Sequence, residues 1–193
     1  MSDSSTRDKL VIGAAEMLGR QGLNGTSIRE LAKHSGTPLG STYHYFPGGK
    51  REFATEAVQF ADQLTMRALQ KHLPDGPLAG LRTLLSMWRS IVINSDFEAG
   101  CPALAVSVQA QPRGEDEPRQ AAAAAFNHWI DLLADSLRQH GASDVDATNT
   151  ATLIVSAVEG TVAICRAQRS IAALDQTEAA LEAMVTAVIS RPS

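Results

Sequence analysis

Apolar residues recur at helical spacing from the start of the chain. Leu10, Ala14, Met17 and Leu18 fall at positions i, i+4, i+7 and i+8, which is the apolar stripe of an amphipathic helix that ends at Gly22. No segment of useful length alternates between apolar and polar residues as a half-buried strand would. The pattern predicts an all-α protein.

Two short helices with clear boundary signals follow. Ser27 and Glu30 have capping-box spacing, in which the hydroxyl accepts from a free backbone N–H and the carboxylate reaches back. Gly36 is expected to end this helix as its C′ residue. Thr37 then reads as the N-cap of a second short helix, with Pro38 at the first helical position and the end near Phe46.

Further breaks divide the rest of the chain. The clearest is Pro74-Asp75-Gly76-Pro77, and another is expected at Leu174-Asp175. The helices expected beyond the second short one span residues 50–73, 78–93, 102–110, 119–140, 147–169 and 177–190. The count is about nine helices. We divide the chain into an N-terminal three-helix module (1–49), a connecting helix (50–73) and a C-terminal helical domain (74–193).

Composition narrows the class of protein. The 193 residues are 44% hydrophobic and 20% charged, and no apolar run approaches the roughly 18 residues of a membrane span. The polar N-terminus lacks the pattern of a secretory signal, so we expect a cytoplasmic protein without membrane contact. Cys101 and Cys165 lie far apart and match no metal-ligand spacing, and the chain shows no motif for a cofactor.

The net charge of −4 is unevenly distributed. Up to Glu56 the chain carries seven basic and six acidic residues, so nearly all of the negative excess lies beyond it. This balance is less basic than expected of a module that binds nucleic acid. Arg7 and Lys9 could add phosphate contacts, and any affinity for DNA should depend strongly on salt.

The two short helices carry the informative chemistry. Two helices joined by a tight turn with a glycine, after a supporting helix, are typical of a helix-turn-helix DNA reader, here at about residues 27–46. Small or hydroxylated residues open the second helix and can approach base edges and thymine methyl groups. Tyr43 and His44 can donate to phosphate oxygens, and Lys50 places an ammonium beside free N-terminal amides.

These residues resemble the TetR family of transcriptional repressors. The resemblance rests on Thr26–Ala32, Gly36-Thr37, Gly40–Phe46 and Lys50. The run Pro47-Gly48-Gly49-Lys50 and the pair Cys101-Pro102 are similar to a branch of the family, some of whose members control drug-efflux genes. The resemblance implies a homodimer of about nine helices per subunit, whose N-terminal module binds operator DNA and whose C-terminal helices hold a dimer face and an effector pocket.

The resemblance also implies DNA-contact residues. Pro38 to Thr42 would face bases, Arg29 is a candidate contact to guanine, and Ser27, Tyr43, His44 and Lys50 would contact the backbone. The predicted set is Ser27, Arg29, Thr37, Pro38, Leu39, Gly40, Ser41, Thr42, Tyr43, His44 and Lys50.

Large apolar residues of the C-terminal part are candidates for an effector pocket as a group, although core packing adequately explains each of them. They are Met87, Trp88, Phe97, Phe126 and Trp129. The last two helices carry more apolar surface than outer helices of one subunit should expose, which predicts a four-helix dimer interface. Its candidate residues are Val158, Thr161, Val162, Cys165, Met184 and Val188. Gly160 would allow close backbone approach there.

The sequence therefore predicts a ligand-responsive transcriptional regulator, most simply a repressor released from a pseudo-palindromic operator by a small hydrophobic effector. It is not expected to be an enzyme, because no acid–base pair, nucleophile or metal-ligand set has the required spacing. The alternative is a small all-α enzyme or a helical interaction module without specific DNA binding.

Overall fold

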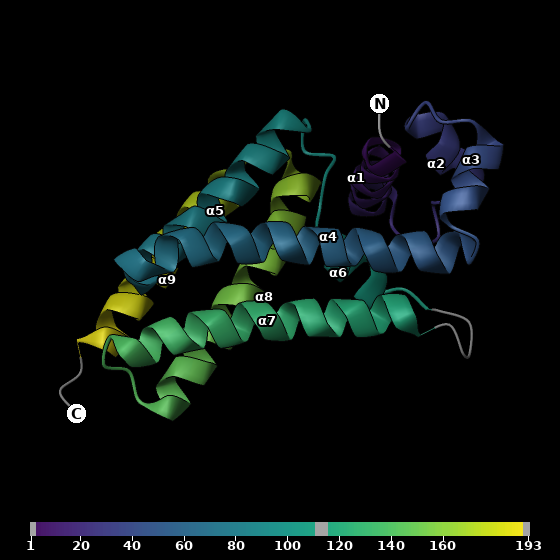
Figure 1. Cartoon of the computed structure of the whole chain (residues 1–193). Coiled ribbons are helices and arrows are strands. Elements are labelled where there is room, and N and C mark those ends of the chain that lie inside the picture. Colours follow the sequence, from purple (N-terminus) through teal and green to yellow (C-terminus); the bar gives the residue numbers. More distant parts are fainter. Residues whose placement is uncertain (1–2, 111–115, 191–193) are drawn as a thin grey trace. The chain divides into compact units, whose positions relative to one another are not determined.

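The computed structural model describes residues 3–110 and 116–190, and these fold as helices without a strand (Figure 1). The elements are α1 (Asp3–Gln21), α2 (Ile28–His34), α3 (Leu39–Tyr45), α4 (Gly49–His72), the 3-10 turn η1 (Leu73–Asp75), α5 (Pro77–Asn94), α6 (Pro102–Ser107), α7 (Glu117–Gln139), α8 (Asp144–Gln168) and α9 (Ala172–Ile189). The all-α prediction is confirmed, with nine α-helices in the described ranges.

Residue contacts divide the chain into two compact units. The first unit joins the residues up to Gln63 with Cys101–Ala125, and the second joins Leu64–Gly100 with the residues from Phe126 onward. This division differs from the boundaries expected at residues 49 and 73. The reason is that α6 packs on α1 and therefore belongs to the first unit.

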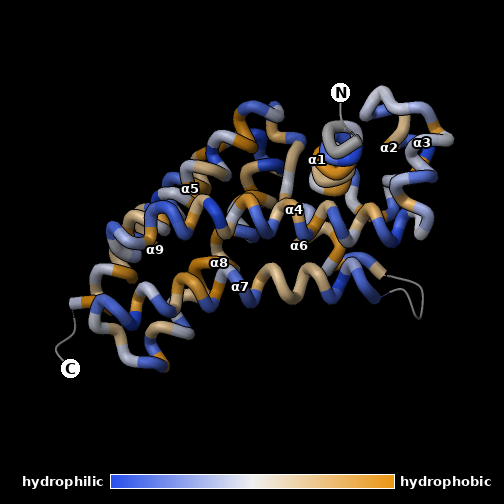
Figure 2. The backbone as a smooth tube through the Cα atoms, viewed as in Figure 1, coloured by the Kyte–Doolittle hydropathy of each residue, from blue (hydrophilic) through white to orange (hydrophobic). Residues whose placement is uncertain are grey.

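The core of the first unit forms where α1, α2 and α3 meet the start of α4. Leu10, Ala14 and Leu18 of the predicted α1 stripe are fully buried. The rings of Phe46 and Phe53 pack edge to face with centroids 6.2 Å apart, which anchors the end of α3 on α4. Apolar and polar positions alternate at helical spacing along α4 (Figure 2).

A glycine sets the distance between α1 and α2. A Cβ at Gly13 would lie 2.5 Å from Ser35 Oγ and 3.1 Å from His34 Cδ2. Real Cβ atoms essentially never come as close as 2.5 Å to another atom, so Gly13 lets the end of α2 lie directly on α1.

The second unit is built around α8, which packs on α9 and on α5. Ile154, Val158 and Val185 are among its buried residues, and the hydroxyls of Thr161 and Thr177 are hydrogen-bonded at 2.7 Å between α8 and α9. By length and composition α8 could cross a membrane, contrary to the expectation from apolar runs. Half of its apolar window is buried within the protein, however, and the core helix of a soluble protein has the same composition.

Several helix boundaries differ from the predictions. Pro38, not Thr37, is the N-cap of α3, and α6 ends at Ser107 rather than at residue 110. Helix α8 begins at Asp144, three residues before the predicted start, because Ser143 caps it. The Oγ of Ser143 accepts from the backbone N–H of Asp146 at 3.1 Å. The predicted break at Leu174-Asp175 is wrong, since α9 already begins at Ala172.

The true break between α8 and α9 lies at Arg169, in the left-handed conformation with φ 50°. The backbone N–H of Ser170 donates to the carbonyl of Cys165 at 3.2 Å and that of Arg169 to Arg166 at 3.4 Å, a closure in which glycine is the usual residue.

Side-chain contacts hold Arg169 in this conformation. Its guanidinium donates to Asp96 Oδ2 at 2.6 Å and to Glu98 Oε1 at 3.2 Å, and lies 5.9 Å from the centroid of the Phe97 ring. Asp96 and Phe97 are themselves left-handed, with φ of 53° and 62°. We call Asp96, Phe97, Glu98 and Arg169 the Arg169 clamp. It ties the turn after α5 to the end of α8.

The clamp generates a prediction about stability. Arg169→Ala and Arg169→Gly both remove the ion pairs and the ring contact, but only glycine adopts the left-handed conformation without a steric penalty. We expect the Tm of Arg169→Ala to lie roughly 2 to 4 °C below that of Arg169→Gly for a chain of this size. Thermal unfolding followed by circular dichroism measures the difference. Equal Tm values for the two variants would contradict a left-handed backbone at residue 169 that costs a side chain stability.

Candidate nucleic-acid interface

The first helix of the predicted helix-turn-helix begins at Ser27 as expected. Ser27 Oγ accepts from the backbone N–H of Glu30 at 3.2 Å and donates to Glu30 Oε2 at 2.8 Å. The N-cap prediction is confirmed, although the carboxylate bonds to the hydroxyl. Because that hydroxyl hydrogen is already bound, Ser27 can donate to a phosphate only by giving up Glu30.

A tight turn then joins α2 to α3. Gly36 is left-handed with φ 61°, and its N–H donates to the carbonyl of Lys33 at 3.3 Å. The N–H of Thr37 donates to the carbonyl of Ala32 at 2.9 Å, which completes a Schellman closure. The predicted C′ role of Gly36 is confirmed, and this turn fixes the direction in which α3 leaves α2.

One face of α3 is exposed. Leu39 is 38% and Tyr43 51% exposed, and they stand four residues apart on the same side of the helix. Pro38, Gly40 and His44 are exposed as well. Nothing lies within 4 Å of the position that a Cβ would take at Gly40. No side chain therefore projects from the surface at Gly40, next to Leu39, and this allows the close approach that contact with base edges requires.

The opposite face of α3 is buried. Thr42 is fully buried, and its Oγ1 donates to the carbonyl of Pro38 at 3.2 Å. The predicted base contact of Thr42 is therefore wrong, because i+4 spacing places this residue on the same side as Phe46 in the core. Ser41 and Thr37 are half-buried, and Thr37 Oγ1 points to the carbonyl of Ser35 at 3.5 Å.

The start of α4 offers fewer free amides than expected. The N–H of Gly48 donates to Glu52 Oε2 at 2.7 Å, and the N–H of Gly49 donates to the carbonyl of Phe46 at 2.9 Å. Lys50 is half-buried and forms no ion pair within the described residues. Its ammonium, rather than the helix end, is the group available to a phosphate at this position.

Carboxylates engage two arginines of the first unit in ion pairs. Arg7 lies 2.6 Å from Glu56, and Arg51 lies 3.5 Å from Glu117. The His34 ring is hydrogen-bonded to Glu16 at 2.9 Å.

Other cations of this unit form no ion pair with the described residues. They are Lys9, Arg29, Lys33 and Lys50. Sequence reasoning missed Lys33. It lies four residues after Arg29, so the two exposed cations share one side of α2, and this spacing was the available signal.

The Arg7–Glu56 pair spans a hollow of about 330 Å³ between α1 and α4, lined also by Val11, Phe60 and Gln63. Burial raises the pKa of Glu56 above its ordinary value, against the opposing effect of Arg7, and nearby Glu52 raises it further. Arg7, which we expected to reach a phosphate, is held here by a partly buried carboxylate.

Comparison with known proteins decides what this arrangement is. Residues 10–57 match the family of bacterial regulatory proteins, tetR family, and residues 77–180 match the C-terminal domain of LmrA/YxaF-like transcriptional regulators. The chain belongs to the TetR family. The predicted resemblance is confirmed, and the chain is a helix-turn-helix transcriptional regulator rather than an enzyme.

Individual relatives agree with this assignment. An uncharacterized HTH-type transcriptional regulator of Mycobacterium tuberculosis is 34% identical over 192 residues, covering 97% of each chain. The HTH-type transcriptional regulator LmrA of Bacillus subtilis is 27% identical, covering 83% of this chain and 86% of its own. The crystal structure of the regulatory protein TetR from Rhodobacter sphaeroides has a TM-score of 0.81 at 22% identity, covering 92% of this chain and 97% of that one.

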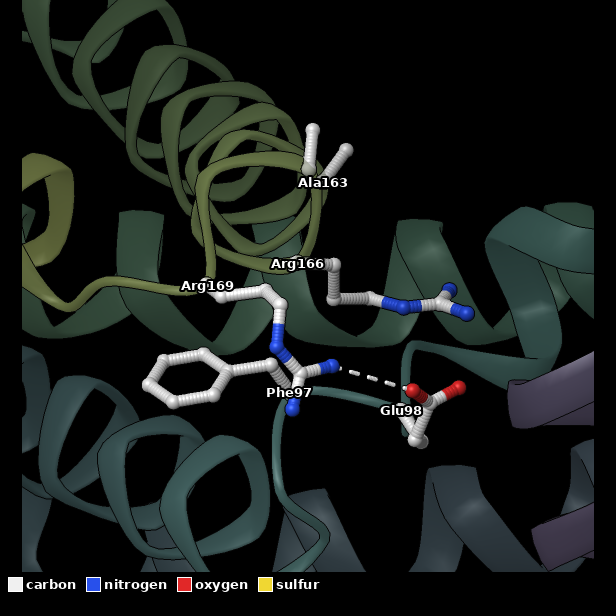
Figure 3. A pocket seen from close by; sticks show the side chains of 6 residues that line it. Phe97, Glu98, Ala163, Arg166 and Arg169 are labelled. Atoms are coloured by element: carbon white, nitrogen blue, oxygen red, sulfur yellow. Dashed lines mark hydrogen bonds and ion pairs between the residues drawn. The ribbon is translucent and has the colours of Figure 1, made fainter.

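In this TetR-family regulator the five candidate effector residues differ in burial and do not line one common hollow. Trp88 and Trp129 are buried, and the Trp129 ring packs edge to face on Phe126 with centroids 5.4 Å apart. Met87 is half-buried on α5. Phe97 instead lines an open hollow of about 390 Å³ with Arg166 and Arg169 (Figure 3). Phe97 thus belongs to the Arg169 clamp.

The candidate dimer residues lie mostly inside the protomer. Val158, Thr161, Val162, Cys165 and Val188 are buried, and only Met184 is half-buried. The prediction that these five buried residues form the dimer face is therefore wrong. The apolar stripes of α8 and α9 pack on each other within one subunit. Among the described residues, no group of three or more His, Cys, Asp or Glu side chains could hold a metal ion.

The Arg7–Glu56 pair generates a prediction about DNA affinity. Glu56→Gln removes the charge that holds Arg7, so we expect about threefold tighter DNA binding and a salt slope steeper by about 0.9, the value for one more phosphate contact. Fluorescence anisotropy at several salt concentrations measures both.

The matched control is Glu98→Gln, which removes the same charge in the second unit. Folding should not suffer in Glu56→Gln. Because the folded-state pKa of Glu56 is raised, the ionised carboxylate costs stability as the pH rises above its ordinary pKa. An unchanged salt slope in Glu56→Gln would contradict the hypothesis that the Glu56 carboxylate keeps Arg7 from contacting a phosphate.

Proposed function

We propose that this regulator is a cytoplasmic repressor that binds a pseudo-palindromic operator as a homodimer and is released by a small hydrophobic effector. The observation that carries the proposal is the exposed face of α3, with Leu39 and Tyr43 outward, next to cations of α2 and α4 that form no ion pair with any described residue. TetR-family regulators bind operator DNA and typically form homodimers.

The exposed residues divide into two roles. We assign base contacts to Pro38, Leu39, Gly40 and Ser41, and a guanine contact to Arg29. We assign phosphate contacts to Tyr43, His44 and Lys50, with Lys33 added, while Ser27 and Thr37 lie at the margin of the interface. In a homodimer the two α3 helices would enter successive major grooves about 34–36 Å apart.

The dimer face we propose is the exposed side of α8 and α9. Between Asp146 and Arg166 the only charged residue of α8 is Glu159, which is buried, so the outer face of this helix carries no charge there. The exposed residues of α8 that we assign to this face are Asn149, Thr152, Leu153, Ser156, Gly160, Ala163 and Ile164. The exposed residues of α9 that we assign to it are Gln176, Ala179, Ala180, Ala183 and Ala187. Small uncharged residues at helical spacing allow two such pairs to pack as a four-helix bundle.

The effector site we propose lies in the second unit near Phe126 and Trp129, with Met87 and Trp88 as further lining. Phe126 is half-buried and packs on buried Trp129, so an apolar molecule entering there gains aromatic contacts. An effector that binds better to the conformation with low operator affinity releases the DNA, and bound operator weakens effector binding by the same factor.

A titration of duplex DNA from upstream of the gene, at defined salt, tests operator binding. We expect Tyr43→Phe to weaken binding to all sequences alike by severalfold, because it removes a phosphate donor. Arg29→Ala should instead reduce the ratio between specific and unrelated DNA by about 5- to 100-fold. Sequence-independent binding by the unmodified protein would rule out specific repression, and identical behaviour of the two variants would contradict the division of roles.

A charge on the proposed dimer face tests the assembly. Nothing lies within 4 Å of a Cβ placed at Gly160, so Gly160→Arg fits the protomer but would bury a charge in the bundle. We expect this variant to sediment as a monomer at micromolar concentration and to lose operator affinity by more than tenfold. The control is Ser86→Arg, at an exposed position on α5. A Gly160→Arg dimer as stable as the control would place the interface elsewhere.

A further inference from the structure

The least expected side chain of the exposed α3 face is Leu39. Three other leucines of the first unit, Leu10, Leu18 and Leu31, are completely buried, whereas Leu39 is 38% exposed. It is the first residue of α3, directly after exposed Pro38 and before exposed Gly40. A leucine left in water forgoes the free energy that burial of its isobutyl group would contribute.

The position of Leu39 is set by the fold. Thr42 Oγ1 bonds to the Pro38 carbonyl and Phe46 fills the core, so the buried side of α3 is fixed and Leu39 must point outward. Tyr43 follows one turn later on the same side. When a recognition helix enters the major groove, its N-terminal residues meet the base edges. Leu39 is therefore placed to meet a base rather than the backbone.

The chemistry of the groove restricts what Leu39 can contact there. In the major groove the base edges present nitrogen and oxygen donors and acceptors, with the C5 methyl group of thymine as the apolar exception. A leucine cannot replace the hydrogen bonds that water makes to a polar edge, so covering such an edge costs free energy. Covering a methyl group buries apolar surface on both sides.

We propose that Leu39 reads the C5 methyl group of a thymine at one position in each operator half-site. This assignment rests on the proposed function and deepens it, because it names a base and the atom by which that base is recognised. The open space at Gly40 supports it, since nothing lies within 4 Å of the position that a Cβ would take at this residue, directly after Leu39.

Replacement of single thymines by deoxyuridine tests the proposal. A duplex is first selected from a randomised library with the full-length protein, and each thymine is then exchanged for deoxyuridine, which keeps the pairing and the hydrogen-bonding groups but lacks the methyl. We expect one position per half-site at which the exchange weakens binding about fourfold, the equivalent of one methyl group removed from contact. Exchange in both half-sites should weaken binding about 15-fold if the two contacts are independent.

The Leu39→Ala variant identifies the residue responsible. It should bind the thymine and deoxyuridine duplexes equally well, while Tyr43→Phe loses affinity for both but keeps their ratio. Cytosine and 5-methylcytosine at the same position give a second readout, in which the methyl should improve binding by the unmodified protein but not by Leu39→Ala. Leu39 is exposed, so the variant should retain its helical circular dichroism and Tm.

The outcomes separate the two levels of the argument. If the library yields no preferred sequence, both the specific regulator and the thymine contact are refuted. If a sequence is selected but no deoxyuridine exchange matters, or the exchange still matters in Leu39→Ala, the thymine contact by Leu39 is overturned while the proposed regulator stands.

Discussion

A seven-residue helix can present a reading surface only if its other side is held firmly, and this constraint governs the first unit. Isolated helices of this length are not stable in water, so α3 depends on tertiary contacts. Thr42 bonds back to Pro38, and Phe46 packs against Phe53 of α4. The Schellman turn at Gly36 fixes the other end. Together these contacts fix the buried side of α3, and Leu39 and Tyr43 face outward as a consequence.

The first unit is not a strongly basic DNA-binding module, because the chain up to Glu56 carries seven basic and six acidic residues. Carboxylates engage Arg7 and Arg51, so among the described residues Lys9, Arg29, Lys33 and Lys50 are the cations left to meet phosphates. Non-specific attraction to DNA scales with the phosphates neutralised. A regulator with few free cations binds unrelated DNA weakly, and a larger share of its operator affinity must then come from direct contact with bases.

The parts of the fold that follow common local rules could be predicted from the sequence, and those that break the rules could not. Ser27 and Gly36 are residue types that prefer the conformations they adopt, so the boundaries of α2 were predictable. Arg169, Asp96 and Phe97 adopt a conformation in which glycine is usual, and contacts between residues more than 70 positions apart hold Arg169 there. No local sequence pattern indicates such a break. The end of α8 was predicted to within one residue, but the start of α9 was not.

The same distinction explains the errors at the interfaces. Apolar periodicity identified Val158, Val162 and Val188 as a buried stripe, which they are, but it could not tell burial within one subunit from burial between two. For Thr42 the residue type suited a base contact, and only its i+4 relation to Phe46 placed it in the core.

Leu39 is the opposite case, because its residue type is suited to a core and its position is not. An exposed leucine beside a glycine lowers solubility and adds nothing to the stability of the isolated protomer. Departures from local rules that the fold does not explain are where function is to be sought. The fold explains the left-handed Arg169 through its clamp, whereas the core contacts of α3 explain only why Leu39 points outward and not why this position carries a leucine.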